Sequence, residues 1–187
     1  MVPDARKRLS RNLIRRAGRI RLLLMDVDGV LTDGSIWLLS WPDGTAQEIK
    51  GFSAYDGAGL KLARSAGLRT GIITGRSSPA TTRRAKEANI EFVYQNRPEK
   101  LAAYKKILRR ARVTDSEVAY VGDDLPDLPV MTRVGFAIAV ANAAPEVKSV
   151  AHYVTRRSGG DGAVREVIEL VLKAQGKWAV AVKKARA

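Results

Sequence analysis

Acidic side chains follow two apolar segments of the chain, at the points where those segments end. Asp26 and Asp28 come after one apolar run, and Asp123 and Asp124 come after another. Because the carboxyl ends of parallel strands meet at one edge of an open α/β sheet, we expect the carboxyl groups of Asp26, Asp28 and Asp123 to converge there. Such a cluster repels itself unless a cation holds it, and oxygen ligands favour a hard ion. The spacing therefore predicts a site for one divalent cation, most simply Mg²⁺.

The composition excludes several other kinds of site. The chain has no Cys and a single His, His152, so it can form neither a thiol nucleophile nor a thiolate or His-rich metal centre. Asp26 does not begin an EF-hand loop, because Trp37 stands where that loop needs a bidentate Glu. Gly57 and Gly59 lack the third glycine of a dinucleotide-binding turn. The chemistry must therefore use carboxylates, hydroxyls, Lys, Arg or a bound metal.

Short apolar runs alternate with helix-like segments along the chain. The runs predict strands at 22–25, 70–74, 90–94, 118–121 and 135–140. The segments between them predict helices at 57–66, 79–88, 98–111 and 162–174. Such alternation with short connections is typical of βαβ units, so the sequence predicts an α/β fold with a parallel sheet that brings Thr74 to the same edge as the carboxylates.

Residues 35–50 interrupt this alternation. Two strand-like arms flank the turn-forming residues Pro42, Asp43 and Gly44, which predicts a β-hairpin directly after the first strand. Its apolar side chains suit an interface with another subunit; the alternative is a hairpin packed on its own domain. These side chains are Ile36, Trp37, Leu38, Leu39 and Trp41.

Four motifs occur in order at the ends of the predicted elements. They are DVDGVLTD at 26–33, TGR at 74–76, Lys100 near a helix start, and GDDLPD at 122–127. This order resembles the four-motif signature of the haloacid dehalogenase-like (HAD) phosphohydrolases. The resemblance implies a Rossmannoid fold, in which a parallel sheet lies between two layers of helices.

Three further segments narrow the resemblance. FSAYDGAG at 52–59, YVGDDLPDLPVM at 120–131 and GDGAVRE at 160–166 are similar to the 3-deoxy-D-manno-octulosonate 8-phosphate (KDO 8-phosphate) phosphatase subfamily, over residues 20–178. The resemblance implies a phosphatase of lipopolysaccharide biosynthesis. A phosphatase for a nine-carbon, sialic-acid-type sugar phosphate is the nearest alternative.

The resemblance also implies a role for each motif residue. Asp26 would be the nucleophile that forms an aspartyl-phosphate, and Asp28 would act as general acid and then as general base. The Asp26 side chain, the main-chain carbonyl of Asp28 and Asp123 would hold Mg²⁺. Thr74 would donate a hydrogen bond to the phosphoryl group, and Lys100 would supply a fixed cation. Asp127 is expected to brace the site rather than to bind the metal.

Substrate contacts are implied by the same resemblance. The substrate carries a carboxylate as well as a phosphate, so additional cations should line the site. Lys61 and Asp161 depart from the familiar pattern, in which Arg and a basic or neutral residue stand at these positions. The expected substrate-binding residues are Asp28, Ser53, Ala54, Tyr55, Asp56, Gly57, Lys61, Gly75, Arg76, Arg84, Lys100 and Asp124.

The spacing of the motifs leaves no room for a cap domain. HAD enzymes commonly insert a cap after the first or the second motif, but here only the hairpin and one helix separate Asp28 from Thr74. Only one helix and a strand separate Arg76 from Lys100. We therefore expect a capless enzyme whose site is closed by neighbouring subunits, in the homotetramer that the resemblance implies.

The basic character of the chain is concentrated at its ends. The formal net charge is +14, and most of it falls within residues 1–21 and 173–187. We expect a basic extension at 1–20, a phosphatase domain at 21–175 and a basic tail at 176–187. Leu9, Leu13, Ala17 and Ile20 form one weak apolar stripe in the extension, which either docks on the domain or meets an anionic membrane surface.

The charged ends also suggest a different class of function. A catalytically inactive HAD scaffold could bind polyanions through them, although they contain one aromatic residue, Trp178, and no base-stacking motif. We expect no specific nucleic-acid partner. The sequence contains neither a membrane-spanning apolar run nor a signal-peptide pattern, which predicts a cytoplasmic protein.

Overall fold

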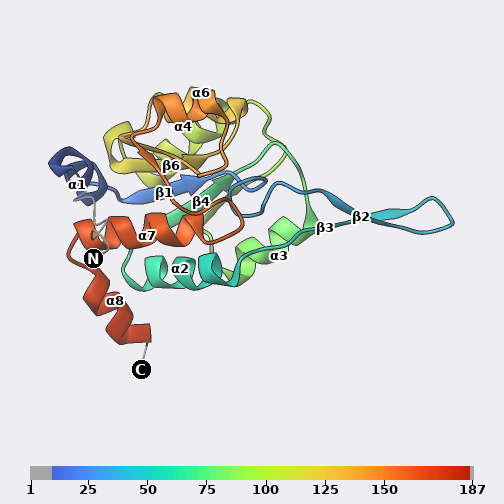
Figure 1. Ribbon diagram of the computed structural model, residues 1–187, viewed down its shortest axis with the longest axis horizontal. Coiled ribbons are helices and arrows are strands. Elements are labelled where there is room, and N and C mark those ends of the chain that lie inside the picture. The colour runs from blue at the N-terminus through green and yellow to red at the C-terminus, as the bar shows by residue number, and fades with distance from the viewer. Residues whose placement is uncertain (1–9, 186–187) are drawn as a thin grey trace, which may run out of the picture.

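A parallel sheet of six strands forms the centre of the computed structural model, which describes residues 10–185 (Figure 1). The strand order is β5-β4-β1-β6-β7-β8, so β1 lies between β4 and β6. The strands are β1 (Leu22–Met25), β4 (Arg69–Ile73), β5 (Phe92–Tyr94), β6 (Val118–Gly122), β7 (Phe136–Ala139) and β8 (Tyr153–Val154). The predicted parallel α/β sheet is confirmed. The edge strand β8 was not predicted, because two residues give no detectable apolar run.

Helices cover both faces of the sheet. The helices α2 (Ala54–Ser65), α3 (Pro79–Glu87) and α7 (Ala163–Ala174) lie on one face. The other face carries α4 (Lys100–Ala111), α5 (Leu128–Met131) and α6 (Pro145–Val150). All four side chains of β1 are buried, because the strand has helices above and below it. The result is the predicted three-layer arrangement. Short 3₁₀ turns lie at Asp115–Glu117, before β6, and at Leu125–Asp127, before α5.

The N-terminal basic segment folds against this domain. Helix α1 (Arg11–Gly18) packs on α7 and buries Ala17 completely. Ile20, two residues after the helix, is buried as well. The apolar stripe predicted here is therefore docked on the domain within the described residues; Leu9 lies outside them. No helix of residues 10–185 has both the length and the apolar character needed to cross a bilayer.

The C-terminal basic segment also contains a helix, α8 (Trp178–Ala185). Its Trp178 ring lies 5.3 Å from the Arg165 guanidinium and 5.1 Å from Lys173 Nζ, and Ala181 is buried. These contacts explain why a segment that sequence alone assigns to a tail has regular structure. The boundaries at residues 20 and 175 stay predictions.

The hairpin of β2 (Trp37–Ser40) and β3 (Ala46–Ile49) extends far from the domain (Figure 1). Its strands pair in antiparallel register, as the turn residues predicted. Trp37 and Leu38 are each 64% exposed, and every side chain from residue 35 to 47 is exposed. The alternative of a hairpin packed on its own domain is therefore wrong, and its apolar surface faces outward.

Candidate active site

Three carboxylates meet at the carboxyl edge of the sheet. Asp26 follows β1, while Asp123 and Asp127 follow β6, and one carboxylate oxygen from each lies within 4.8 Å of the others. The predicted convergence of Asp26 with Asp123 is present. The prediction that the Asp28 carboxyl joins this group is wrong, because that side chain forms ion pairs elsewhere and Asp127 takes the third place.

Asp127 braces the loop that follows β6. Its Oδ1 accepts hydrogen bonds from Lys100 Nζ and the Tyr120 hydroxyl, both at 2.7 Å. Its Oδ2 accepts from the backbone N–H groups of Asp123 at 2.9 Å and Asp124 at 3.3 Å. With these bonds made, Asp127 holds its neighbours in place, as predicted.

Lys100 lies between two of the carboxylates. Its Nζ is 2.9 Å from Asp26 Oδ2 and 2.7 Å from Asp127 Oδ1, and its side chain is only 3% exposed. Burial alone would lower the pKa of Lys100, but the charges of Asp26 and Asp127 raise it above its usual value. Lys100 is therefore a permanent buried cation beside Asp26.

Two oxygens of the cluster have no partner among the described residues. Asp26 Oδ1 and Asp123 Oδ1 are buried and accept no hydrogen bond. Burial raises the pKa of Asp26 to about 6, against the opposing charge of Lys100. Burial and then the charges of Asp26 and Asp127 raise the pKa of Asp123 to about 8. Unpaired buried carboxylate oxygens are costly, and a small divalent cation between them would satisfy both, so this donor set fits Mg²⁺.

A glycine lets the main chain after β1 approach this cluster. Gly29 has a positive φ of 92°, and a Cβ atom there would lie 2.0 Å from Asp123 Oδ2. The Thr32 hydroxyl accepts a hydrogen bond from the Gly29 N–H at 3.3 Å and so ties the loop together. Close packing of the motif loops thus depends on the absence of a side chain at position 29.

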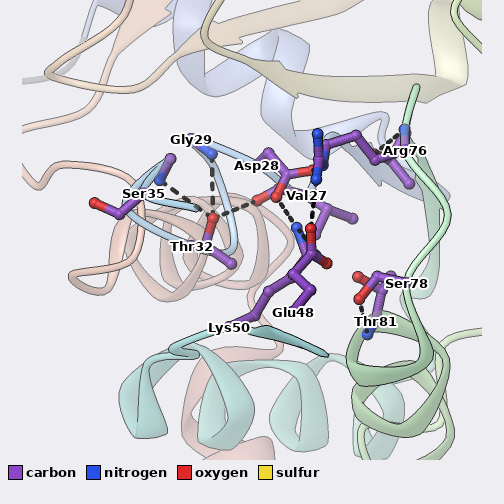
Figure 2. Close-up of polar contacts among 12 residues, drawn as sticks. Val27, Asp28, Gly29, Thr32, Ser35, Glu48, Lys50, Arg76, Ser78 and Thr81 are labelled. Carbon is purple, nitrogen blue, oxygen red and sulfur yellow. Dashed lines mark hydrogen bonds and ion pairs between the residues drawn. The ribbon is translucent and has the colours of Figure 1, made fainter. Parts of the chain in front are cut away.

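The Asp28 carboxyl belongs to a second charged group (Figure 2). Lys50 Nζ forms an ion pair with Asp28 Oδ1 and lies 3.5 Å from Glu48 Oε1. Arg76 Nη2 is 2.5 Å from Glu48 Oε2, and Arg76 Nε is 4.0 Å from Asp28 Oδ2. Sequence reasoning placed Asp28 and Arg76 at the site but missed Glu48 and Lys50. The only signal was two charged residues, two positions apart, at the base of an apolar hairpin.

The second motif lies at the end of β4, as predicted. Thr74 is buried, and its hydroxyl oxygen accepts a hydrogen bond from the Arg76 N–H at 3.3 Å. A Cβ atom on Gly75 would lie 3.7 Å from the Cα of Pro98, two residues before Lys100. The second motif therefore lies beside the segment that leads into α4.

Several predicted substrate-binding residues gather at a separate cavity. Arg84 Nη2 donates to the Ser53 carbonyl at 3.0 Å and lies where a Cβ atom on Gly57 would stand. Lys61 and Arg84 line a cavity of about 550 Å³ beside Ala54. None of the carboxylates Asp26, Asp28 or Asp123 lines this cavity.

Other predicted contacts have visible partners of their own. Asp56 is buried, and its Oδ1 accepts from the Arg165 N–H at 2.7 Å, so it anchors the start of α7. Tyr55 is 65% exposed, with the Arg157 guanidinium 5.7 Å from its ring centre. Asp124 is exposed and accepts from the Leu125 N–H at 2.8 Å. Of these three, only Tyr55 and Asp124 are open to a ligand.

Comparisons with known proteins agree with this geometry. Residues 80–168 match the family model of haloacid dehalogenase-like hydrolases. A 3-deoxy-D-manno-octulosonate 8-phosphate phosphatase of Escherichia coli (strain K12) is 44% identical over 169 residues, which are 90% of this chain and 88% of that protein.

Solved structures give the same result. The enzyme of that name from Yersinia pestis has a TM-score of 0.86 and 43% identity, covering 91% of this chain and 90% of that one. The enzyme from Moraxella catarrhalis, in complex with a magnesium ion, a phosphate ion and a KDO molecule, has a TM-score of 0.86 and 41% identity, covering 92% and 97%. The chain therefore belongs to the haloacid dehalogenase-like hydrolases and, within them, to the 3-deoxy-D-manno-octulosonate 8-phosphate phosphatase family.

Proposed function

We propose that this chain is a Mg²⁺-dependent phosphatase that hydrolyses KDO 8-phosphate to KDO and phosphate, a cytoplasmic step of lipopolysaccharide biosynthesis. The observation that carries the proposal is the pair of unpartnered buried oxygens on Asp26 and Asp123, next to the buried cation Lys100. Relatives that are 41–44% identical over nine-tenths of the chain carry this activity in their names, and one solved structure holds Mg²⁺, phosphate and KDO.

The proposed mechanism assigns a step to each motif residue. The Asp26 side chain, the main-chain carbonyl of Asp28 and Asp123 would hold Mg²⁺, which supplies positive charge to the phosphoryl oxygens when bound. One Asp26 oxygen attacks phosphorus and forms an aspartyl-phosphate, while Asp28 protonates the departing sugar oxygen. Asp28 then accepts a proton from the water that hydrolyses the aspartyl-phosphate. Thr74 and Lys100 orient the phosphoryl group and balance its charge.

The choice of substrate is tested by comparing two sugar phosphates. We expect phosphate release from KDO 8-phosphate in the presence of Mg²⁺ to be at least about tenfold faster, in kcat/KM, than release from a nine-carbon sialic-acid-type 9-phosphate, since one misplaced group costs about 1–3 kcal/mol. Equal rates would contradict the choice of the eight-carbon sugar. Release from neither ester would favour the inactive scaffold that binds polyanions.

Metal binding should change how stability depends on pH. The pKa values of Asp26 and Asp123 in the folded chain, about 6 and about 8, lie above that of an unfolded Asp, about 4. The folded chain thus retains protons that the unfolded chain releases, so without metal its stability falls as the pH rises from about 4 to 8. Mg²⁺ replaces those protons, and we expect it to raise the melting temperature more at pH 8 than at pH 5.

This prediction is checked by melting curves in EDTA and in Mg²⁺ at both pH values. The Asp123→Asn variant is the control. It lacks one proposed metal ligand, and of the two carboxyl groups Asp123 has the higher pKa. A gain from Mg²⁺ that is equal at the two pH values in the wild-type chain would contradict the metal assignment.

We further propose that the chain works as a homotetramer in which neighbouring subunits close the active site. Two observations support this proposal. The hairpin exposes Trp37, Leu38 and Leu39 to solvent, which is costly for a lone chain. Lys61 and Arg84 line a cavity apart from the carboxylate cluster of their own chain, so they are available to a substrate bound by a neighbour.

Sedimentation equilibrium tests the assembly. We expect a mass of about four chains for the wild type and a smaller species for the double variant Trp37→Ser, Leu39→Ser, because both changes remove apolar surface from the hairpin. Gln47→Ser, an exposed polar position on the same hairpin, should leave the mass unchanged. A wild-type chain that sediments as a monomer would contradict the proposal.

A further inference from the structure

The hairpin meets its own domain through two charged residues. Of residues 35–50, only Glu48 and Lys50 are partly buried, and the Lys50 side chain is 1% exposed. Glu48 lies in β3 and Lys50 directly follows its last residue, Ile49, which is 50% exposed, so Glu48 and Lys50 are two positions apart in extended chain and point to the same side. The contact between hairpin and domain is therefore polar and lies inside the candidate active site.

These two residues complete a ring of alternating charges. Lys50 connects Asp28 to Glu48, and Arg76 connects Glu48 back to Asp28 (Figure 2). When Asp28 is ionised, as it must be to accept a proton from the attacking water, two anions face two cations and the ring carries no net charge; when Asp28 carries the proton for the leaving oxygen, the ring has one positive charge. Lys50 bonds to Asp28 Oδ1, whereas Arg76 Nε lies 4.0 Å from Oδ2, so Lys50 is the contact that restrains the direction in which that carboxyl points.

We infer that Lys50 and Glu48 are positioning residues for the phosphatase reaction, with Lys50 fixing the Asp28 carboxyl and Glu48 fixing Lys50 and Arg76. The inference rests on the proposed function, in which Asp28 transfers the proton to the leaving oxygen. Proton transfer requires heavy atoms within about 3 Å, so a carboxyl that rotates freely would be misplaced for much of the time.

Stability alone gives a weak reason for this ring. Burying a lysine among carboxylates costs desolvation energy that the ion pairs only partly return, and apolar packing is often as stable or more stable. A hairpin base that served only as an anchor could use the apolar residues that are abundant in the rest of the hairpin. Instead, Lys50 contacts Asp28, to which the proposed mechanism assigns proton transfer, and Glu48 contacts Arg76, an expected substrate-binding residue.

The test uses the leaving group to separate positioning from binding and folding. The Lys50→Met variant keeps the length of the side chain and removes its charge. KDO 8-phosphate leaves as a basic alkoxide that needs a proton, whereas p-nitrophenyl phosphate leaves as a stable phenolate that needs little help. We expect Lys50→Met to slow the first phosphoryl transfer from KDO 8-phosphate by about 10- to 100-fold, with little change in KM.

The same variant should slow the burst of p-nitrophenolate by less than about threefold, since general acid catalysis contributes little to that step. Lys50→Arg, which restores the charge, should recover part of the lost rate. Lys106→Met, an exposed lysine on α4, is the matched control and should behave as the wild type with both esters. Glu48→Gln should show the same dependence on the leaving group and is decisive if Lys50→Met fails to fold.

The outcomes separate the inference from the function on which it rests. A wild-type chain that releases no phosphate from either ester overturns both. If the wild type is active and Lys50→Met matches Lys106→Met, only the inference is overturned. A loss of equal size with both esters, or a loss confined to KM, also overturns it, because such results indicate a structural or substrate-binding role.

Discussion

Replacing Asp26 with Asn is expected to lower phosphate release by at least about 10⁴-fold, the largest effect predicted for any single change in this chain. The amide has nearly the shape of the carboxylate, but its oxygen is a poor nucleophile and it removes one ligand charge from the proposed Mg²⁺ site. The folded chain should tolerate the change, because the carboxylate that it removes is destabilised by burial.

Phosphate release at saturating Mg²⁺, together with the melting temperature, measures this effect. Asp43→Asn at the exposed tip of the hairpin is the matched control, because that carboxylate bonds only within its own turn, to the Thr45 N–H and hydroxyl. Turnover by Asp26→Asn within tenfold of the control would exclude Asp26 as the nucleophile.

The Lys100→Met variant is expected to lose both stability and activity. Its cation balances Asp26 and Asp127, and removal of one partner from a buried ion pair costs about 3–5 kcal/mol, because the remaining charge stays buried and unpaired. Turnover should also fall by about 10²-fold or more, since a fixed cation beside the phosphoryl group is lost.

Urea unfolding and phosphate release measure the two losses separately. The double variant Lys100→Met, Asp127→Asn should recover part of the stability, because it removes one of the two negative charges that the loss of Lys100 leaves unpaired. It should not recover turnover, since the cation is still absent. If Lys100→Met loses no more stability than Lys106→Met, then the buried ion pairs are not the bracing elements that the distances indicate.

The central part of the fold could be predicted because its signals are local. Short continuous apolar runs at β1 and β6 favour strands buried on both faces, and Pro42 to Gly44 favours a turn. Three of the elements that were missed, β8, α5 and α6, have too few residues to show a period, and contacts with neighbouring elements decide their structure. Helix α8 was also missed, because its basic composition is typical of a solvated tail.

The site also contains some residues that local sequence signals could place and others that they could not. Asp26 and Asp123 could be placed because each follows a strand directly, and strand ends in a parallel sheet converge. The Asp28 carboxyl could not be oriented, because its partner Lys50 lies on the far arm of a hairpin whose direction the sequence does not specify. Which cavity Lys61 lines also depends on tertiary packing rather than on sequence spacing.

The position of β1 in the sheet has a consequence for protein synthesis. Leu22 to Met25 pair on one side with residues 69–72 and on the other with residues 118–121, so the strand that ends at Asp26 has one open edge until β6 has been made. A ribosome-bound chain that stops before β6 would expose an apolar strand edge to other nascent chains. Chaperone protection is therefore most needed while the middle of the chain is being translated.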